Sequence, residues 1–326
     1  MDRLVRTGFV FAGLVLAAAA GAQPARQSFD VVTGPASGGY FAAGELIAQT
    51  ISHPPGLVRC ETKGVCAPAG VIVSARSSDG AVSNILAVNL GSAASGLAQA
   101  PVVADAVAGR GVFRRDGPQR HLRVMADLFG EPLALVARPG IAGVRDLRGK
   151  RVSLGEAGCA AVAVEVLSAY GVRGAKLRRE PAKAAAAELR TGQLDALFVL
   201  GDPAVTGDLV ARGAARLVAI DGRPRDRLVE RFPGVAADLV SAGRGTVETI
   251  GVRTLWITAD TASNDVVYGL VRALYSPANR ETLAQAPRPA PDVRVIAAAS
   301  LARLPLHPGA AQFYREAGLL KQAAGN

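Results

Sequence analysis

The sequence is poor in aromatic residues, cysteine and histidine, and these shortages exclude several classes of function. Only 5% of the 326 residues are aromatic, and the 37 basic residues are scattered along the chain. Nucleic-acid binders instead cluster basic side chains or interleave them with aromatic ones, so we expect no nucleic-acid partner. The net charge of +10 suits anionic small molecules better. The three cysteines and three histidines form no zinc-ligand pattern, so we predict neither a metal site nor a cofactor.

The motifs of common nucleotide-binding proteins and hydrolases are also missing. The stretch VVTGPASGGYFAAG, residues 31–44, has a glycine-rich loop, but no Lys-Ser/Thr pair follows Gly39 and the glycine spacing does not fit G-x-G-x-x-G. No G-x-S-x-G, H-E-x-x-H or paired-carboxylate motif occurs elsewhere. Cys159 lies at a predicted helix start, where a thiol can become nucleophilic, but no motif pairs it with a histidine. We therefore predict no enzyme activity and interpret Cys159 as a small apolar residue.

The first 22 residues are typical of a secretory signal peptide. Arg3 and Arg6 precede an apolar stretch at 9–20, and Ala20-Gly21-Ala22 fits a cleavage site. No later segment is long and apolar enough to span a bilayer. The sequence thus predicts a soluble protein, exported to the periplasm, that begins near Gln23.

The cysteines at 60 and 66 are close enough in sequence to form a small disulfide-closed loop. Disulfides form readily in exported proteins, which favours a bond between Cys60 and Cys66 in CETKGVC. Two free thiols, or a metal site that includes His53, are the alternatives.

Short apolar strands alternate with helical segments, which is typical of α/β folds. The predicted strands are 29–33, 57–59, 71–74, 122–126, 133–137, 151–154, 195–200 and 249–258. The predicted helices are 42–52, 81–89, 160–170, 183–190, 264–274 and 309–317, with a proline-rich loop at 286–292. A strand, a glycine loop and a helix follow one another twice, at 31–44 and 152–165. Two helix N-termini that face each other across a cleft would suit a small anion.

Seven stretches, in order along the chain, resemble the TAXI family of TRAP transporter solute receptors. They are TGPASGGYFAAGELIA, SSDGAVSNILAVNLG, LAQAPVVADAVAGRGVF, LRVMADLFGEPLALVARPGI, DLRGKRVSLGEAG, LRTGQLDALFVLGDPA and LPLHPGAAQFYREAGL. The resemblance implies the type II periplasmic-binding-protein fold, an α/β fold with a ligand cleft between two lobes. Lobe I would comprise residues 23–136 and 250–326, and lobe II residues 137–249. The crossings would be at 133–137 and 249–255.

The resemblance also implies a function. Receptors of this family capture a small organic anion, often glutamate-like or a dicarboxylate, and deliver it to a membrane TRAP permease. An alternative is a sensor accessory of the same fold that presents its ligand to a signalling partner. In either case we expect a monomer.

The candidate ligand-binding residues lie at helix starts, in loops and near the lobe crossings. They are Ser37, Gly38, Gly39, Tyr40, Ser78, Ser83, Asn84, Gln99, Glu131, Gly158, Cys159, Ala160 and Arg244. Each also has a purely structural interpretation as a tight turn, a helix cap, a local loop contact or a solvated arginine. Where the family usually has Gly-Ser-Gly-Thr, this chain has Gly-Cys-Ala-Ala at 158–161, so two hydroxyl donors are missing. This departure predicts either a more apolar acid than usual or a partly degenerate receptor.

Overall fold

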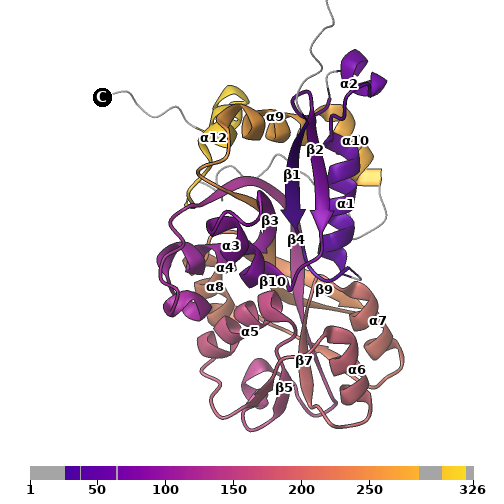
Figure 1. Ribbon diagram of the computed structural model, residues 1–326. Helices are drawn as coiled ribbons and strands as arrows, with labels where there is room; N and C mark the ends of the chain where they lie inside the picture. Colours follow the sequence, from indigo (N-terminus) through magenta and orange to yellow (C-terminus); the bar gives the residue numbers. More distant parts are fainter. Residues whose placement is uncertain (1–25, 37, 64, 286–302, 321–326) are drawn as a thin grey trace, which may run out of the picture.

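The computed structural model describes residues 26–36, 38–63, 65–285 and 303–320 (Figure 1). The predicted signal peptide, the proline-rich loop and the candidate Ser37 lie outside the described residues. The strands are β1 (Gln27–Val32), β2 (Val71–Arg76), β3 (Ser95–Gln99), β4 (Leu122–Ala137), β5 (Arg151–Ser153), β6 (Lys176–Arg178), β7 (Ala196–Leu200), β8 (Arg216–Val218), β9 (Val235–Ala242) and β10 (Gly245–Ala259). The helices are α1 (Gly39–Ile51), α2 (Val58–Lys63), α3 (Ala81–Asn89), α4 (Ala100–Ala108), α5 (Ala157–Ala169), α6 (Ala182–Arg190), α7 (Pro203–Ala211), α8 (Gly222–Arg231), α9 (Asn264–Leu274), α10 (Pro277–Gln285) and α12 (Pro308–Glu316), with short 3-10 helices η1 (Gly111–Arg114) and η2 (Val144–Leu147). Within the described ranges, no helix is long and apolar enough to cross a membrane.

Two long strands, β4 and β10, connect two regions of sheet. In the first region, β1 pairs in parallel with β2 and β3, and β10 runs antiparallel to β3 and to the first part of β4. In the second region, the last part of β4 pairs antiparallel with β7 and β8, and β5 pairs in parallel with β6 and β7. The hairpin of β9 and β10 joins this end of the molecule to the first region. Figure 1 shows α1, α9, α10 and α12 around the upper strands and α5, α6 and α7 around the lower ones.

Strand β4 changes its partners at Gly130-Glu131-Pro132. Residues up to Pro132 pair with β10, whereas Leu133 is the first residue that pairs with β7. Proline offers no backbone N–H to a neighbouring strand, so it suits a point where a strand leaves one partner for another. The rest of β4 is almost continuously apolar because both faces of the strand are covered. The two strands predicted at 122–126 and 133–137 are therefore parts of one long strand.

The buried apolar side chains form separate clusters on the two sides of this point. One cluster includes β4 residues up to Phe129 and β10 residues from Leu255 onward. A second includes β4 residues from Leu133 onward and β10 residues up to Val252. A third, smaller cluster lies with the second part of β4 and packs against α6 and α7. The middle of the crossing strands thus lies between two independently packed cores.

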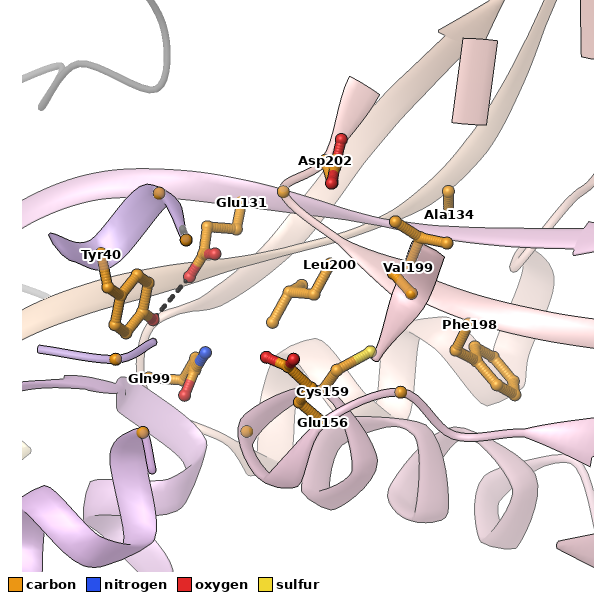
Figure 2. A pocket seen from close by; sticks show the side chains of 18 of the residues that line it. Tyr40, Gln99, Glu131, Ala134, Glu156, Cys159, Phe198, Val199, Leu200 and Asp202 are labelled. Atoms are coloured by element: carbon orange, nitrogen blue, oxygen red, sulfur yellow. Dashed lines mark hydrogen bonds between the residues drawn. The ribbon is translucent and has the colours of Figure 1, made fainter. Parts of the chain in front are cut away.

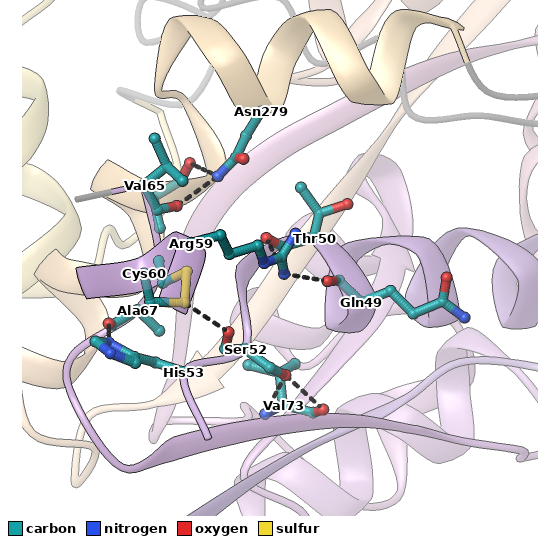
Figure 3. The surroundings of a disulfide bond; sticks show 12 residues. Gln49, Thr50, Ser52, His53, Arg59, Cys60, Val65, Ala67, Val73 and Asn279 are labelled. Atoms are coloured by element: carbon teal, nitrogen blue, oxygen red, sulfur yellow. Dashed lines mark hydrogen bonds between the residues drawn. A yellow bond between two sulfur atoms is a disulfide. The ribbon is translucent and has the colours of Figure 1, made fainter. Parts of the chain in front are cut away.

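The prediction that Cys60 and Cys66 form a disulfide is confirmed (Figure 3). The strand predicted at 57–59 is wrong, because this segment enters helix α2. Arg59 donates hydrogen bonds to main-chain carbonyls in the last turn of α1, and Asn279 of α10 donates one at 2.6 Å to a carbonyl of the same loop. The disulfide and these hydrogen bonds together hold a short surface segment against α1 and α10.

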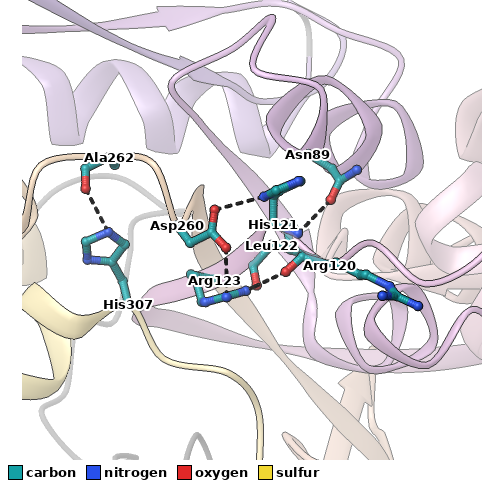
Figure 4. A network of polar contacts seen from close by, with 8 residues as sticks. All are labelled: Asn89, Arg120, His121, Leu122, Arg123, Asp260, Ala262 and His307. Atoms are coloured by element: carbon teal, nitrogen blue, oxygen red, sulfur yellow. Dashed lines mark hydrogen bonds and ion pairs between the residues drawn. The ribbon is translucent and has the colours of Figure 1, made fainter.

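A polar network ties the start of β4 to the end of β10 (Figure 4). Asp260 accepts a hydrogen bond from Arg123 at 2.8 Å and lies 3.0 Å from Nδ1 of His121. The main-chain N–H of His121 donates to the Asn89 side chain at 3.0 Å, which adds α3 to the network. His307 is buried before α12, and burial lowers its pKa; its Nδ1 accepts a hydrogen bond from the main-chain N–H of Gly309 at 3.2 Å and so caps that helix. These contacts fix the outer ends of the crossing strands.

Candidate functional site

A cavity of about 610 Å³ lies beside the middle of β4 (Figure 2). The glycine-rich loop after β1 lines it through Gly34 and Gly38, and the loop after β5 lines it through Gly155 and Gly158. Its volume is within the range of small-molecule binding sites. The two glycine loops that stand out in the sequence therefore share one cavity, although they come from different sheet regions.

Five of the helices named above begin at the wall of this cavity without a side-chain cap. Their N-cap residues are Gly38 of α1, Gly80 of α3, Gln99 of α4, Glu156 of α5 and Pro181 of α6, and all five line the cavity. The first N–H groups of a helix lack partners within the helix, and the helix dipole makes this end positive. By contrast, α7 is capped by Asp202, which accepts hydrogen bonds from two main-chain N–H groups at 3.1 Å each. The uncapped helix starts favour an anionic or otherwise hydrogen-bond-accepting guest.

Glu131 of β4 contributes a buried carboxyl group to the wall of the cavity. Its Oε2 accepts hydrogen bonds from Tyr40 Oη, at 2.8 Å, and from Thr254 Oγ1. The side-chain amide of Gln99 also hydrogen-bonds to this carboxyl group. Burial raises the pKa of Glu131, while the three neutral partners act in the opposite direction. Burial and then the charge of Glu131 raise the pKa of Tyr40. The network therefore joins α1, β3, β4 and β10 around one acid.

Cys159 lines the cavity in the first turn of α5, but its thiol is not activated. Its burial, followed by the nearby carboxyl groups of Glu131 and Glu156, raises its pKa well above the ordinary value. Because the thiolate is the nucleophilic form of cysteine, this environment disfavours covalent chemistry. Within the described ranges, no group of three or more His, Cys, Asp or Glu side chains is arranged to hold a metal ion.

Apolar residues form part of the cavity wall. They include Phe129, which lies edge-on to Tyr40, and Ala134, Phe198, Val199, Leu200 and Val240. In Figure 2, Leu200 points into the space between Glu131 and Cys159. The cavity thus combines uncapped helix starts, one buried acid and a hydrophobic wall.

The structure brings some of the predicted binding residues to the cavity and leaves others away from it. Those that line it are Gly38, Gly39, Tyr40, Gln99, Glu131, Gly158 and Cys159. Those that do not are Ser78, Ser83, Asn84, Ala160 and Arg244. Asn84 donates hydrogen bonds to the carbonyls of Thr33 and Leu97 and so connects α3 to two strands. Ser78 accepts a hydrogen bond from a main-chain N–H in the turn before α3, and Arg244 is exposed at the turn between β9 and β10.

Sequence reasoning did not single out Thr254 or Gly201, which both adjoin Glu131. Thr254 reaches the acid only because β10 pairs with β4, and that pairing cannot be read from the local sequence. Gly201 has a φ of 65°, and a Cβ there would lie 2.7 Å from Oε1 of Glu131. The stretch LFVLGDPA has the same order of strand, glycine and helix start as the two loops above, and this order could have identified a third cavity loop.

The chain has the two-lobed α/β fold of type II periplasmic binding proteins, which confirms the predicted fold class. Among solved structures, MatC from Rhodopseudomonas palustris with bound malate is 18% identical, covers 80% of this chain and 88% of its own, and has a TM-score of 0.50. A protein from Xanthomonas citri bound to chloride ion is 11% identical, covers 90% of this chain and 99% of its own, and has a TM-score of 0.52. The chain belongs to the NMT1-like family, whose model matches residues 31–318. This family belongs to the group of periplasmic solute-binding proteins.

Proposed function

We propose that this protein is the periplasmic receptor of a TAXI-type TRAP transporter, which captures a small organic acid and delivers it to a membrane permease. The observation that carries the proposal is the set of five uncapped helix starts around one cavity. A carboxylate that enters this space accepts hydrogen bonds from their N–H groups. Each hydrogen bond to a charged group contributes about 1.5–3 kcal/mol, and several acting together suffice for specific binding.

The proposed lobes are residues 23–136 with 250–326, and residues 137–249. The change of apolar core between Phe129 and Leu133 of β4 supports a division into two lobes, although it places 133–136 and 250–252 with the core of the second lobe. Both lobes contribute helix starts to the cavity, so a bound acid links them and favours a closed arrangement. Closure removes water from the acid and strengthens its hydrogen bonds. Of the proposed ligand contacts, Gly39 and Gly158 offer main-chain N–H groups in the first turns of α1 and α5, whereas the N–H of Gly38 already donates to the carbonyl of Pro35 at 2.8 Å.

The ligands of the two structural neighbours support an anionic guest. MatC is bound to malate and the Xanthomonas citri protein to chloride, and both ligands carry negative charge. The signal-peptide pattern at residues 1–22 and the membership of a periplasmic family support export. The resemblance of seven ordered stretches to TAXI receptors supports a TRAP permease as the partner and favours a glutamate-like acid or a dicarboxylate as the solute.

The receptor function is tested by thermal unfolding of the purified protein in the presence of a panel of organic acids. A ligand that binds only the folded state stabilises it by mass action, by about 2.7 kcal/mol at a concentration 100 times Kd. We expect one chemical class to raise Tm and the others to leave it unchanged. If no acid in a broad panel raises Tm, the receptor proposal is contradicted.

Delivery to a permease needs a second measurement. Uptake of the stabilising acid into proteoliposomes that contain a TRAP permease from the same genome should depend on this protein. If the acid binds but uptake does not respond to the protein, the sensor-accessory alternative replaces transport.

A further inference from the structure

The charged side chains around the cavity are mainly acidic. The acidic lining residues are Asp79, Glu131, Glu156 and Asp202. Lys183, which is exposed, is the basic residue among the described lining residues, and no arginine is among them although the chain has 32 arginines. Arginine is the side chain best suited to hold a second carboxylate through paired hydrogen bonds. Among the described lining residues, this cavity therefore offers a carboxylate helix starts but no guanidinium.

Among the residues that the structure describes, none gives the buried carboxyl group of Glu131 a cationic partner. Its interaction partners, Tyr40, Thr254 and Gln99, are all neutral. A buried carboxylate without an opposite charge is costly, and an opposite charge nearby offsets that cost. Gly201 packs closely against the Oε1 side of the carboxyl group, since a Cβ at this position would stand 2.7 Å from that oxygen, and it brings no charge to it.

A second acceptor close to Glu131 is also without a partner. Gln99 is 6% exposed, and its Oε1 is buried and accepts no hydrogen bond from the described residues. Gln99 and Glu131 line the same cavity and their side chains lie near each other in Figure 2. A protonated amine has three N–H donors and no acceptor, so it matches a carboxylate and an amide oxygen at the same time. A second carboxylate on the ligand would instead meet Glu131 with the same sign of charge.

We propose that the solute is a zwitterion with one carboxylate, one protonated amine and an apolar body, in which Glu131 and Gln99 Oε1 bind the amine. The uncapped helix starts hold the carboxylate, and the apolar wall around Phe198 and Leu200 contacts the body. This inference rests on the proposed receptor function and narrows its solute class. It departs from the dicarboxylates and glutamate-like acids that the resemblance favours, because a zwitterion with an apolar body carries no net charge.

The test uses matched sets of small molecules on the wild-type protein. Each set has one carbon skeleton, that of L-valine, L-leucine or L-phenylalanine, and contains the amino acid, the acid without the amino group and the amine without the carboxyl group. L-Glutamate and glutarate add the second carboxylate. Binding is measured by titration calorimetry. In at least one set we expect the amino acid to bind about 10- to 100-fold more tightly than either partial analogue, and more tightly than L-glutamate.

The variant Glu131→Gln keeps the shape of the side chain and removes its charge. It should weaken binding of the favoured amino acid about tenfold or more. The control Glu45→Gln, on the exposed face of α1 away from the cavity, should leave the affinity for that amino acid unchanged. Equal or tighter binding of the acids without an amino group, or of glutarate, overturns the zwitterion proposal and leaves the receptor function intact. Unchanged amino-acid binding in folded Glu131→Gln also overturns it. If no compound of any class binds, both proposals fail together.

Discussion

Alanine at position 158 would fill the narrow space between the start of α5 and the side chain of Gln99. A Cβ built on Gly158 would lie 2.7 Å from Nε2 and 2.8 Å from Cδ of Gln99, and would contact Oε1 as well. Carbon atoms in proteins pack no closer than about 3.5 Å, so the amide must move. Gln99 is 6% exposed, and its open side is the cavity that it lines. We therefore expect Gly158→Ala to push Gln99 into the cavity and away from Glu131.

Two opposing effects decide the sign of the change in stability. Alanine is favoured over glycine inside a helix by about 1 kcal/mol, and Gly158 lies in α5 with a φ outside the positive region. Overpacking costs about 1–3 kcal/mol, and the lost hydrogen bond to Glu131 adds about 0.5–1.5 kcal/mol. We expect a net destabilisation of about 1–3 kcal/mol and a loss of ligand affinity, because the displaced amide occupies ligand space.

The matched control is Gly207→Ala in α7. Gly207 also lies within a helix, and a Cβ there would meet nothing within 4 Å. This variant should gain up to about 1 kcal/mol from helix propensity alone. Urea unfolding of the two variants and the wild type measures the differences in the free energy of unfolding. Titration with the solute found in the thermal screen measures the differences in affinity.

A rescue experiment separates the contact with Gln99 from other causes. Gln99→Ala in the Gly158→Ala background removes the obstructing amide and should recover much of the stability lost to overpacking. If Gly158→Ala instead stabilises the protein as much as Gly207→Ala and leaves affinity unchanged, the described position of Gln99 against α5 is refuted.

Three further predictions concern stability. Replacing Cys60 and Cys66 by serine should lower the free energy of unfolding by about 2 kcal/mol, because the disulfide closes a short loop and so reduces the entropy of the unfolded chain. Urea unfolding with no added reductant measures this loss, and an unchanged free energy of unfolding would show that the bond does not constrain the unfolded chain. Asp202→Ala should cost about 1 kcal/mol through the lost cap of α7, with Asp202→Asn close to wild type; equal losses in both variants would contradict capping. The Arg151 hydrogen bonds lower the pKa of Asp195 to about 2, so this carboxylate stabilises the fold above about pH 4 and the contribution is lost as pH falls towards 2. Asp195→Asn should therefore cost about 1 kcal/mol at pH 7, after allowance for solvent screening, and almost nothing near pH 2; a cost independent of pH would contradict the charge effect.

The sequence predicts best those elements whose signals are local. The helices predicted at 81–89 and 264–274 have the bounds of α3 and α9, and the loop glycines at 34–39 and 155–158 do lie at one cavity. Apolar periodicity, a turn before the helix and glycine after a strand are all properties of neighbouring residues. The prediction of the disulfide is of the same kind, because its two cysteines are six residues apart.

The remaining features depend on partners far apart in the chain. Two separate strands are predicted at 122–126 and 133–137, yet β4 continues through Pro132 because a different strand becomes its neighbour there. Helix α8 was missed because its sequence, GRPRDRLVER, is almost entirely polar and has one buried apolar residue, Leu228. The roles of Thr254 and Gln99 at Glu131 follow from strand pairing, which composition and periodicity do not reveal.

Native mass spectrometry of the protein, purified without unfolding from the cells that produce it, tests the central claim most directly. The claim is that the cavity between the two glycine loops holds a small solute by its carboxylate. We predict one bound molecule of low mass on the wild type, identified as an acid after release, and its loss or strong reduction in Gly158→Ala but not in Gly207→Ala. A wild-type protein that carries no solute, even after incubation with extracts of the cells that produce it, would contradict the account.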